Sequence, residues 1–208
     1  MATTHDPRMT ENERRARAIY GPGPRRLRWT AEEYYRLAEL GFFRNRRVEL
    51  IEGDIIQMSA VKPHHSIALD LADEAIQAVF GPGYRMRIQQ PIDLGRRSQP
   101  EPDLAVVAGR ARDFTDHPTT ALLVVEVSDS SLRRDRTVKV HLYAQAGLAD
   151  YWIINLVERQ LEIHRNPGPD PDRAGRFRYA EVNIVPADGQ ASPLAKPDAV
   201  IAVADLLP

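Results

Sequence analysis

The spacing of hydrophobic and polar residues predicts an alternation of helices and strands from residue 29 onward. Thr30 is a typical helix N-cap, apolar residues follow it at helical spacing, and Gly41 is a typical stop. Two strand-like runs, 48–51 and 55–58, then flank a short Glu-Gly-Asp turn. This region is therefore predicted to form a helix followed by a β-hairpin.

The longest amphipathic segment runs from His65 to about Phe80 and predicts the first core helix. Its apolar positions form one stripe, with acidic and amide side chains on the opposite face. The stripe contains Ile67, Ala68, Leu71, Ala72, Ala75, Ile76 and Val79. Strands are predicted after this helix over residues 85–89, 92–94 and 104–107, where turn-forming residues separate short apolar runs.

The run 121–127, Ala-Leu-Leu-Val-Val-Glu-Val, is nearly continuous in apolar residues, as expected of a central strand that is covered on both faces. A helix with Gly147 as its stop follows, and then a strand over 151–156. A strand, helix, strand succession of this kind indicates a right-handed parallel crossover. The order of helix, three strands, helix and strand predicts an α/β fold with a mixed sheet flanked by helices.

The two ends of the chain differ from this centre. Residues 1–28 combine proline and glycine with scattered arginines and lack a sustained apolar period, which predicts a disordered tail. Weaker strands over 161–164, 177–182 and 200–203 predict a C-terminal β extension. We therefore expect a single domain over residues 29–208, preceded by the tail.

Composition excludes several kinds of site. The chain has no cysteine, which excludes disulfides, thiolate zinc sites and cysteine nucleophiles. Its 28 basic and 29 acidic residues argue against binding nucleic acid through overall charge, so any such contact must be local. No run has the length of a membrane span and the start lacks a secretory signal, so we expect a cytoplasmic protein that does not associate with membranes.

Two acidic residues carry the main functional prediction. Glu126 interrupts the most apolar strand, where an ionised carboxylate is costly without a partner. Asp103 opens the preceding strand, so the two carboxylates converge at one sheet edge if these strands are neighbours. Neighbouring carboxylates repel, which raises the pKa of one of them or recruits a cation between them, and an all-oxygen ligand set suits Mg²⁺ or Mn²⁺. The alternative is that both acids serve the structure as hydrogen-bond acceptors.

Lys139 is the only lysine between residues 63 and 195 in a chain that otherwise uses arginine. A compact ammonium group with an adjustable pKa beside a reactive water would explain this choice. A salt bridge to Asp135, four residues earlier, explains it about as well. Five arginines near the two acids are predicted either to contact phosphates or to be ordinary surface residues: Arg96, Arg97, Arg133, Arg134 and Arg136. Three aromatic residues are predicted to be core residues: Tyr143, Tyr151 and Trp152.

These residues resemble those of a known family. Pro102-Asp103, followed by Glu126-Val127-Ser128, is similar to the motif of the PD-(D/E)xK nuclease superfamily. Within that superfamily, the segments 48–53, 126–139, 143–147 and 151–152 resemble the Uma-type ("Uma two") family of restriction endonucleases. The resemblance covers roughly residues 29–207.

The resemblance implies a restriction-endonuclease-like fold with a divalent metal, Mg²⁺ or Mn²⁺, at Asp103 and Glu126. It also implies a contribution from Glu49 or His65. An exposed hairpin position is the alternative interpretation for Glu49, and packing at a helix start is the alternative for His65.

In one respect this chain departs from the superfamily. The motif has lysine two residues after the second acid, where this chain has Ser128, so Lys139 must reach the site from the following helix. We expect a metal-dependent endonuclease that cleaves phosphodiester bonds of DNA, acting as a homodimer, with Lys139 as nucleophile activator or charge stabiliser. The alternatives are a non-catalytic dimeric nucleic-acid-binding or regulatory module of the same fold, and a phosphodiesterase acting on RNA or nucleotides.

Overall fold

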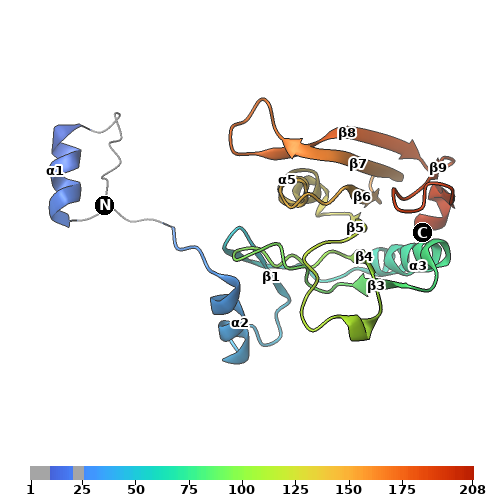
Figure 1. Cartoon of the computed structure of the whole chain (residues 1–208), viewed down its shortest axis with the longest axis horizontal. Coiled ribbons are helices and arrows are strands. Elements are labelled where there is room, and N and C mark those ends of the chain that lie inside the picture. The colour runs from blue at the N-terminus through green and yellow to red at the C-terminus, as the bar shows by residue number, and fades with distance from the viewer. Residues whose placement is uncertain (1–9, 21–25) are drawn as a thin grey trace.

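The computed structural model describes residues 10–20 and 26–208, and a six-stranded mixed sheet forms its centre (Figure 1). The strands lie in the order β3-β4-β5-β6-β7-β8; β5 and β6 are parallel, and the other neighbours are antiparallel. Their bounds are β3 Tyr84–Ile88, β4 Leu104–Ala108, β5 Leu123–Ser128, β6 Asp150–Asn155, β7 Gln160–Pro169 and β8 Phe177–Pro186. The predicted mixed α/β fold and the parallel crossover are confirmed.

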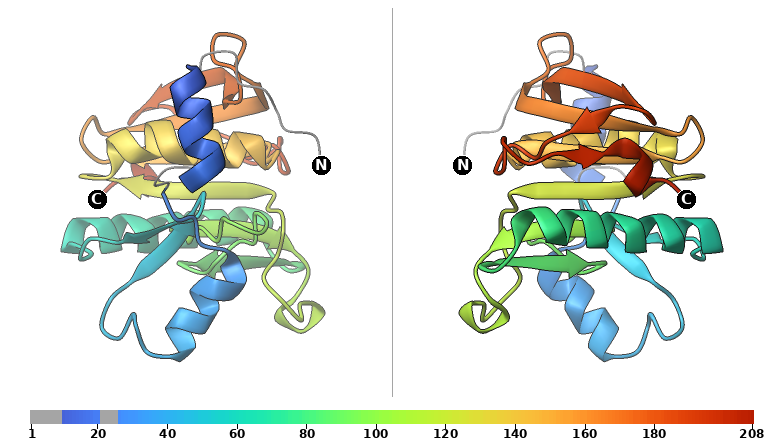
Figure 2. Two further views of the ribbon diagram at one scale, coloured as in Figure 1. Left: turned by 90° about the vertical axis from the view of Figure 1, so that its left-hand side faces the viewer. Right: turned by 90° about the vertical axis from the view of Figure 1, so that its right-hand side faces the viewer.

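Helices cover both faces of this sheet (Figure 2). Helix α3 (Pro63–Phe80) packs on one face through Ala68, Ala72 and Ile76. The other face carries a continuous helical segment formed by α4 (Leu132–Arg134), the π-helical turn η2 (Asp135–Lys139) and α5 (Val140–Gln145). This segment is the connection from β5 to β6, as a parallel pair requires.

Strand β5 lies near the middle of the sheet and is buried along its whole length. Because alternate side chains of a strand point to opposite faces, Val125 and Val127 pack in the core against α3, and Val124 packs in the core against α5. Glu126 has the same parity as Val124, so its carboxylate points toward the helical segment that contains η2.

A helix and a β-hairpin precede the sheet in the chain. Helix α2 (Ala31–Glu39) begins at Thr30 with a complete capping box, and the β1–β2 hairpin (Val48–Ile51 and Asp54–Gln57) follows. The backbone N–H of Gln99 donates to the carbonyl of Leu50 at 2.8 Å, which fixes the hairpin against the loop before β4. Both elements are confirmed; β1 has the predicted bounds, and β2 is shifted by one residue.

The predicted C-terminal β extension is present, and most of it belongs to the central sheet. Strands β7 and β8 belong to the central sheet, and only the short pair of β9 (Gln190–Ala191) and β10 (Ile201–Ala202) forms a further ladder there. The 3₁₀ helices η1 (Ala111–Asp113) and η3 (Val203–Leu206) complete the described elements. Among these described elements, no helix combines the length and the hydropathy needed to cross a membrane.

Two local predictions were wrong. Residues 92–94 form no strand, because the backbone of Ile92 and Asp93 bonds to the carbonyls of Pro100 and Pro118 in neighbouring loops. In α3 the buried stripe includes Leu69 and Phe80, whereas Ile67 is 51% exposed.

Part of the predicted tail is helical. Helix α1 covers Glu11–Tyr20, where no regular structure was predicted from the sequence. Residues 1–9 and 21–25 of that tail lie outside the described residues. The disorder and the domain boundary at residue 29 stay predictions.

Candidate active site

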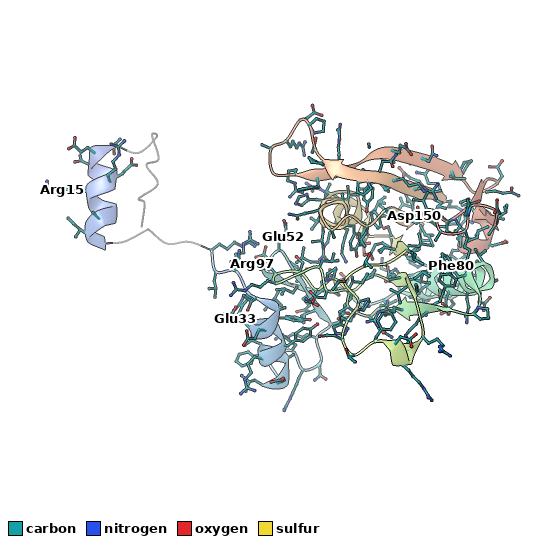
Figure 3. The ribbon with its side chains drawn as sticks, viewed as in Figure 1. Arg15, Glu33, Glu52, Phe80, Arg97 and Asp150 are labelled. Atoms are coloured by element: carbon teal, nitrogen blue, oxygen red, sulfur yellow. The ribbon has the colours of Figure 1, made fainter. Side chains whose placement is uncertain are left out.

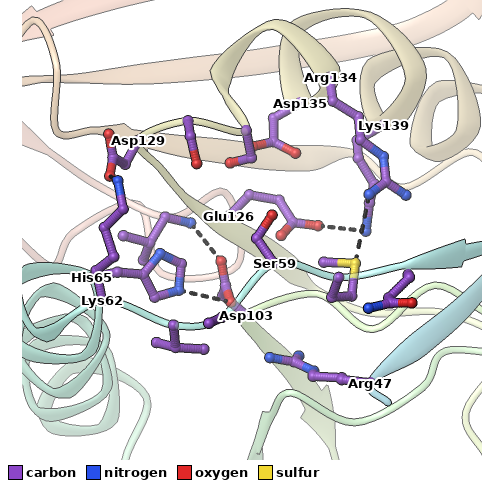
Figure 4. Close-up of a pocket in the computed structure, with 17 residues that line it drawn as sticks. Arg47, Ser59, Lys62, His65, Asp103, Glu126, Asp129, Arg134, Asp135 and Lys139 are labelled. Atoms are coloured by element: carbon purple, nitrogen blue, oxygen red, sulfur yellow. Dashed lines mark hydrogen bonds and ion pairs between the residues drawn. The ribbon is translucent and has the colours of Figure 1, made fainter.

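The chain brings Asp103 and Glu126 together across two neighbouring strands. Leu104 pairs with Val125, so Asp103 and Glu126 are the next facing positions of β4 and β5. Facing residues of antiparallel strands project from the same side of the sheet. Both acids are buried, with 8% and 5% of their surfaces exposed. They line one cavity of about 250 Å³ (Figure 4).

Asp103 is held by three hydrogen bonds. Its Oδ2 accepts from the backbone N–H of Val127 at 2.9 Å. Its Oδ1 lies 3.2 Å from Nε2 of His65 and accepts from the side-chain amide of Gln89 at 3.2 Å. Burial alone would raise the pKa of Asp103, but the hydrogen bond and charge of His65 outweigh it, so the pKa is lowered. Asp103 is therefore an anion in a fixed orientation.

Glu126 is held through one oxygen. Its Oε1 accepts from the hydroxyl of Tyr143 at 2.6 Å and from Nζ of Lys139 at 3.1 Å. Within the described residues its Oε2 has no hydrogen-bond donor. Burial raises the pKa of Glu126 to about 8, and repulsion from Asp103 adds to this effect, although Lys139 opposes it. Unlike Asp103, Glu126 is thus easily protonated near neutral pH when no further cation is present.

Lys139 reaches the acids from the π-helical turn η2. Its side chain is fully buried, and Nζ donates to Glu126 and, at 2.9 Å, to Oε2 of Glu49. Burial lowers the pKa of Lys139, but attraction to Glu126 and Glu49 outweighs it, so the pKa is raised and the ammonium stays charged. Asp135 pairs with the hydroxyl of Ser128 at 2.7 Å instead of forming the helical salt bridge considered as an alternative.

Glu49 and His65 both lie at the site, on opposite sides of the two acids. Glu49 is not an exposed hairpin residue: it is fully buried and bonds Lys139, the guanidinium of Arg134 and the backbone N–H of Glu101. His65, in the first turn of α3, contacts Asp103. The five residues proposed from the sequence are thus brought together from β1, α3, β4, β5 and η2.

Comparisons with known proteins identify the family and the fold. A model of the Uma2 family, described as "Putative restriction endonuclease", matches residues 31–204. The chain belongs to the Uma2 family. A crystal structure from Anabaena variabilis, described as "a putative nuclease belonging to DUF820", matches with a TM-score of 0.61 and 17% sequence identity. The match covers 85% of this chain and 96% of that one and shows a shared nuclease-like fold. No curated protein matches the chain.

Four of the five arginines, for which the sequence allowed either a phosphate contact or a surface position, do not line this cavity. Arg136 turns away from the cavity and binds Glu162, with Nε to Oε2 at 3.0 Å. Arg97 lines a different cavity together with Glu52, near the hairpin (Figure 3). Of the arginines proposed for phosphate contact, Arg134 lines the cavity beside the two acids.

Three further residues of the Uma2 site were not recognised from the sequence as functional. Tyr143 is a core residue as predicted, but its hydroxyl also bonds Glu126; the helical spacing of four from Lys139 is a signal that could have suggested this. Gln89 reaches Asp103 from a backbone with φ of 50°, which no sequence pattern indicates. Arg47 lines the cavity from just before the hairpin.

The donor set of the Uma2 site fits a hard divalent cation. Mg²⁺ takes one or two carboxylates and keeps water in its other positions. Asp103 supplies an ionised carboxylate, and Glu126 supplies an oxygen without a donor at the cavity wall. Within residues 10–20 and 26–208, no three His, Asp or Glu side chains are grouped closely enough to hold a metal by themselves. A cation here would therefore rest on two protein ligands.

Proposed function

We propose that this Uma2 protein is a metal-dependent endonuclease that hydrolyses phosphodiester bonds of DNA. The observation that carries the proposal is the convergence of Asp103, Glu126 and Lys139, from three separate elements, at one cavity. Two buried acids and a buried ammonium are a costly combination, which is found at functional sites more often than elsewhere. The description of the family as restriction endonucleases supports the same reaction class.

In this proposal Asp103 and Glu126 hold Mg²⁺ or Mn²⁺. A divalent ion held there would supply a nucleophilic water at neutral pH and would neutralise charge on the phosphate. The chain prepares this position in two ways: hydrogen bonds from His65, Gln89 and Val127 fix the Asp103 anion, and Tyr143 turns Glu126 so that one oxygen faces the cavity.

Lys139 acts as a charge stabiliser. Its raised pKa keeps the ammonium protonated, and a protonated amine cannot accept a proton from water. The fixed positive charge instead offsets the negative charge that develops on the phosphate in the transition state. Glu49 holds Nζ in place at 2.9 Å and serves as its permanent counter-ion.

A non-catalytic nucleic-acid-binding or regulatory module is the competing function. It is favoured by the hydrogen bonds on Asp103, which already occupy both oxygens of that carboxylate. In that case the two acids serve as hydrogen-bond acceptors for neighbouring groups of the protein, and no metal is needed. Either function is compatible with a homodimer, which we propose because a duplex has two strands to cut.

The test is a cleavage assay at low ionic strength, because the affinity for DNA falls steeply with salt. We expect purified protein to nick or cut plasmid DNA with Mg²⁺ or Mn²⁺ and to be inert in EDTA. Glu126→Gln, which keeps the shape of the side chain, should lose at least about 100-fold in rate, typical of removing one electrostatic contribution to the transition state.

Arg136→Gln, purified in parallel, serves as the matched control, because Arg136 does not line the cavity. Equal cleavage by wild type and Glu126→Gln would assign the activity to a contaminant. Cleavage by neither protein under any metal would favour the non-catalytic module.

A further inference from the structure

The cationic side chains that line the site differ in how their charge is used. Lys139 is enclosed by Glu49 and Glu126. Lys62 pairs with Asp129 at 2.9 Å. The third donor of Lys139 goes to the hydroxyl of Tyr143 at 3.4 Å, so this ammonium group has no donor left for direct contact with a substrate. Lys62 offers a point charge without the planar fork of an arginine.

Two arginines of the cavity retain unused donors. A guanidinium has five N–H donors. Among the described residues, the side chain of Arg47 has one partner, Glu101, which accepts from Nε at 3.3 Å. Arg134 gives one terminal nitrogen to Glu49 and the other to Sδ of Met58 at 3.5 Å, a weak acceptor. Their side chains are 30% and 26% exposed, so the remaining donors are accessible from the cavity.

Arg47, Arg134 and Met58 all line this cavity. The backbone N–H of Met58 donates to the carbonyl of Arg47 at 2.8 Å, and its sulfur accepts from Arg134. Planar forks with free N–H groups bind phosphate oxygens well, often through two parallel hydrogen bonds. Asp103 and Glu126 line the same cavity as the two arginines.

We propose that Arg47 and Arg134 form a phosphate-binding wall that holds the DNA backbone next to the two acids. This inference rests on the proposed function and adds the binding residues that present the substrate. Arg134 is suited to this task because it can turn to a phosphate without leaving Glu49 unpaired. The carboxylate of Glu49 still accepts from Lys139 and from the backbone N–H of Glu101. Arg136, two residues further along, is excluded because Glu158 and Glu162 engage its guanidinium.

The test measures binding apart from cleavage. In EDTA and in a Glu126→Gln parent, fluorescence anisotropy with a labelled duplex gives Kd at several salt concentrations. We expect Arg47→Gln and Arg134→Gln each to weaken binding about tenfold and to reduce the salt slope by about one. Arg136→Gln should match the parent. Arg134→Lys should keep the slope but bind more weakly, since an ammonium lacks the planar fork.

The outcomes separate this inference from the proposed function. Unchanged Kd and slope in both Arg47→Gln and Arg134→Gln overturn the phosphate wall, and wild-type cleavage would then leave the nuclease function standing. If the arginines govern binding but wild type cleaves nothing, the wall stands and the catalytic function falls. A parent that binds no DNA at low salt overturns both. Thermal melts of each variant verify that it is folded.

Discussion

At the scale of single residues, Glu126 links the site to the stability of the fold. Its folded pKa is about 8, whereas an unperturbed glutamate titrates near 4.5. When folding raises the pKa of an acid, the protonated acid stabilises the folded state. This contribution is complete below the pKa of the unfolded state and is lost as the pH rises through the pKa of the folded state. We expect metal-free protein to lose thermal stability between about pH 4.5 and pH 8, and Glu126→Gln to lose much less.

Melting temperatures in EDTA across this pH range, at constant ionic strength, measure the difference. Glu39→Gln is a suitable control, because Glu39 is 66% exposed on α2 and should leave the pH dependence unchanged. Parallel curves for wild type and Glu126→Gln would show that Glu126 is ionised throughout and would contradict the prediction.

The sequence identified the charged residues whose burial costs free energy, because their adjacent residues already show that they are out of place. An acid in an apolar strand and a lone lysine among arginines both stand out without knowledge of the fold. Arg47 and Gln89 do not, because nothing in their immediate neighbours distinguishes them from surface residues. Their roles depend on contacts with residues far along the chain, such as Gln89 with Asp103.

At the scale of elements, the π-helical turn η2 decides where the lysine points. The N–H of Val140 donates to the carbonyl of Asp135, five residues back, so the turn holds one residue more than an α-helix would. Asp135 and Lys139 both face inward as a result, one to Ser128 and the other to Glu126. π-turns of this kind occur often at functional sites.

Deleting Thr137, whose side chain is exposed, should convert this turn to α-helix. The deletion brings Lys139 one residue closer to Asp135 along the helix, a displacement of about 1.5 Å along the axis. The contacts Ser128–Asp135 and Lys139–Glu126 then cannot both persist, so we expect cleavage to be lost while far-UV circular dichroism stays nearly unchanged. Thr137→Ala keeps the residue count and should retain activity. An active deletion variant would show that the register of η2 is irrelevant to the site.

The sequence predicted elements well where the apolar pattern is long, as in α3 and β5, or where a cap marks the start, as in α2. It was wrong for residues 92–94 because apolar spacing reports burial, and Ile92 is buried in a loop that bonds to other loops. The sequence did not predict η2 either. A π-turn contains one residue more than an α-helical turn. In a short amphipathic segment the pattern of apolar and polar side chains is compatible with either turn.

At the scale of the whole molecule, the shared fold does not by itself determine the activity of the site. At 17% identity the match to the Anabaena variabilis protein covers nearly the whole of both chains, so the layers of helix and sheet tolerate wide sequence change. A fold hosts many functions, and the activity depends on a few side chains placed upon it. Here those side chains come from the hairpin, the region of the inner strands β4 and β5, and the crossover helix.

This distribution has a consequence for the order in which the protein becomes active. Lys139 contacts Glu49 across 90 positions of the chain, and contacts of such separation form late in folding. On refolding from urea, we expect cleavage to return no earlier than the fluorescence of Trp152, which is buried in β6. Activity that precedes this signal would contradict the idea. Because Lys139 follows both acids in the sequence, a nascent chain carries the acids before it carries their partner and is inert until the crossover helix has been synthesised and docked.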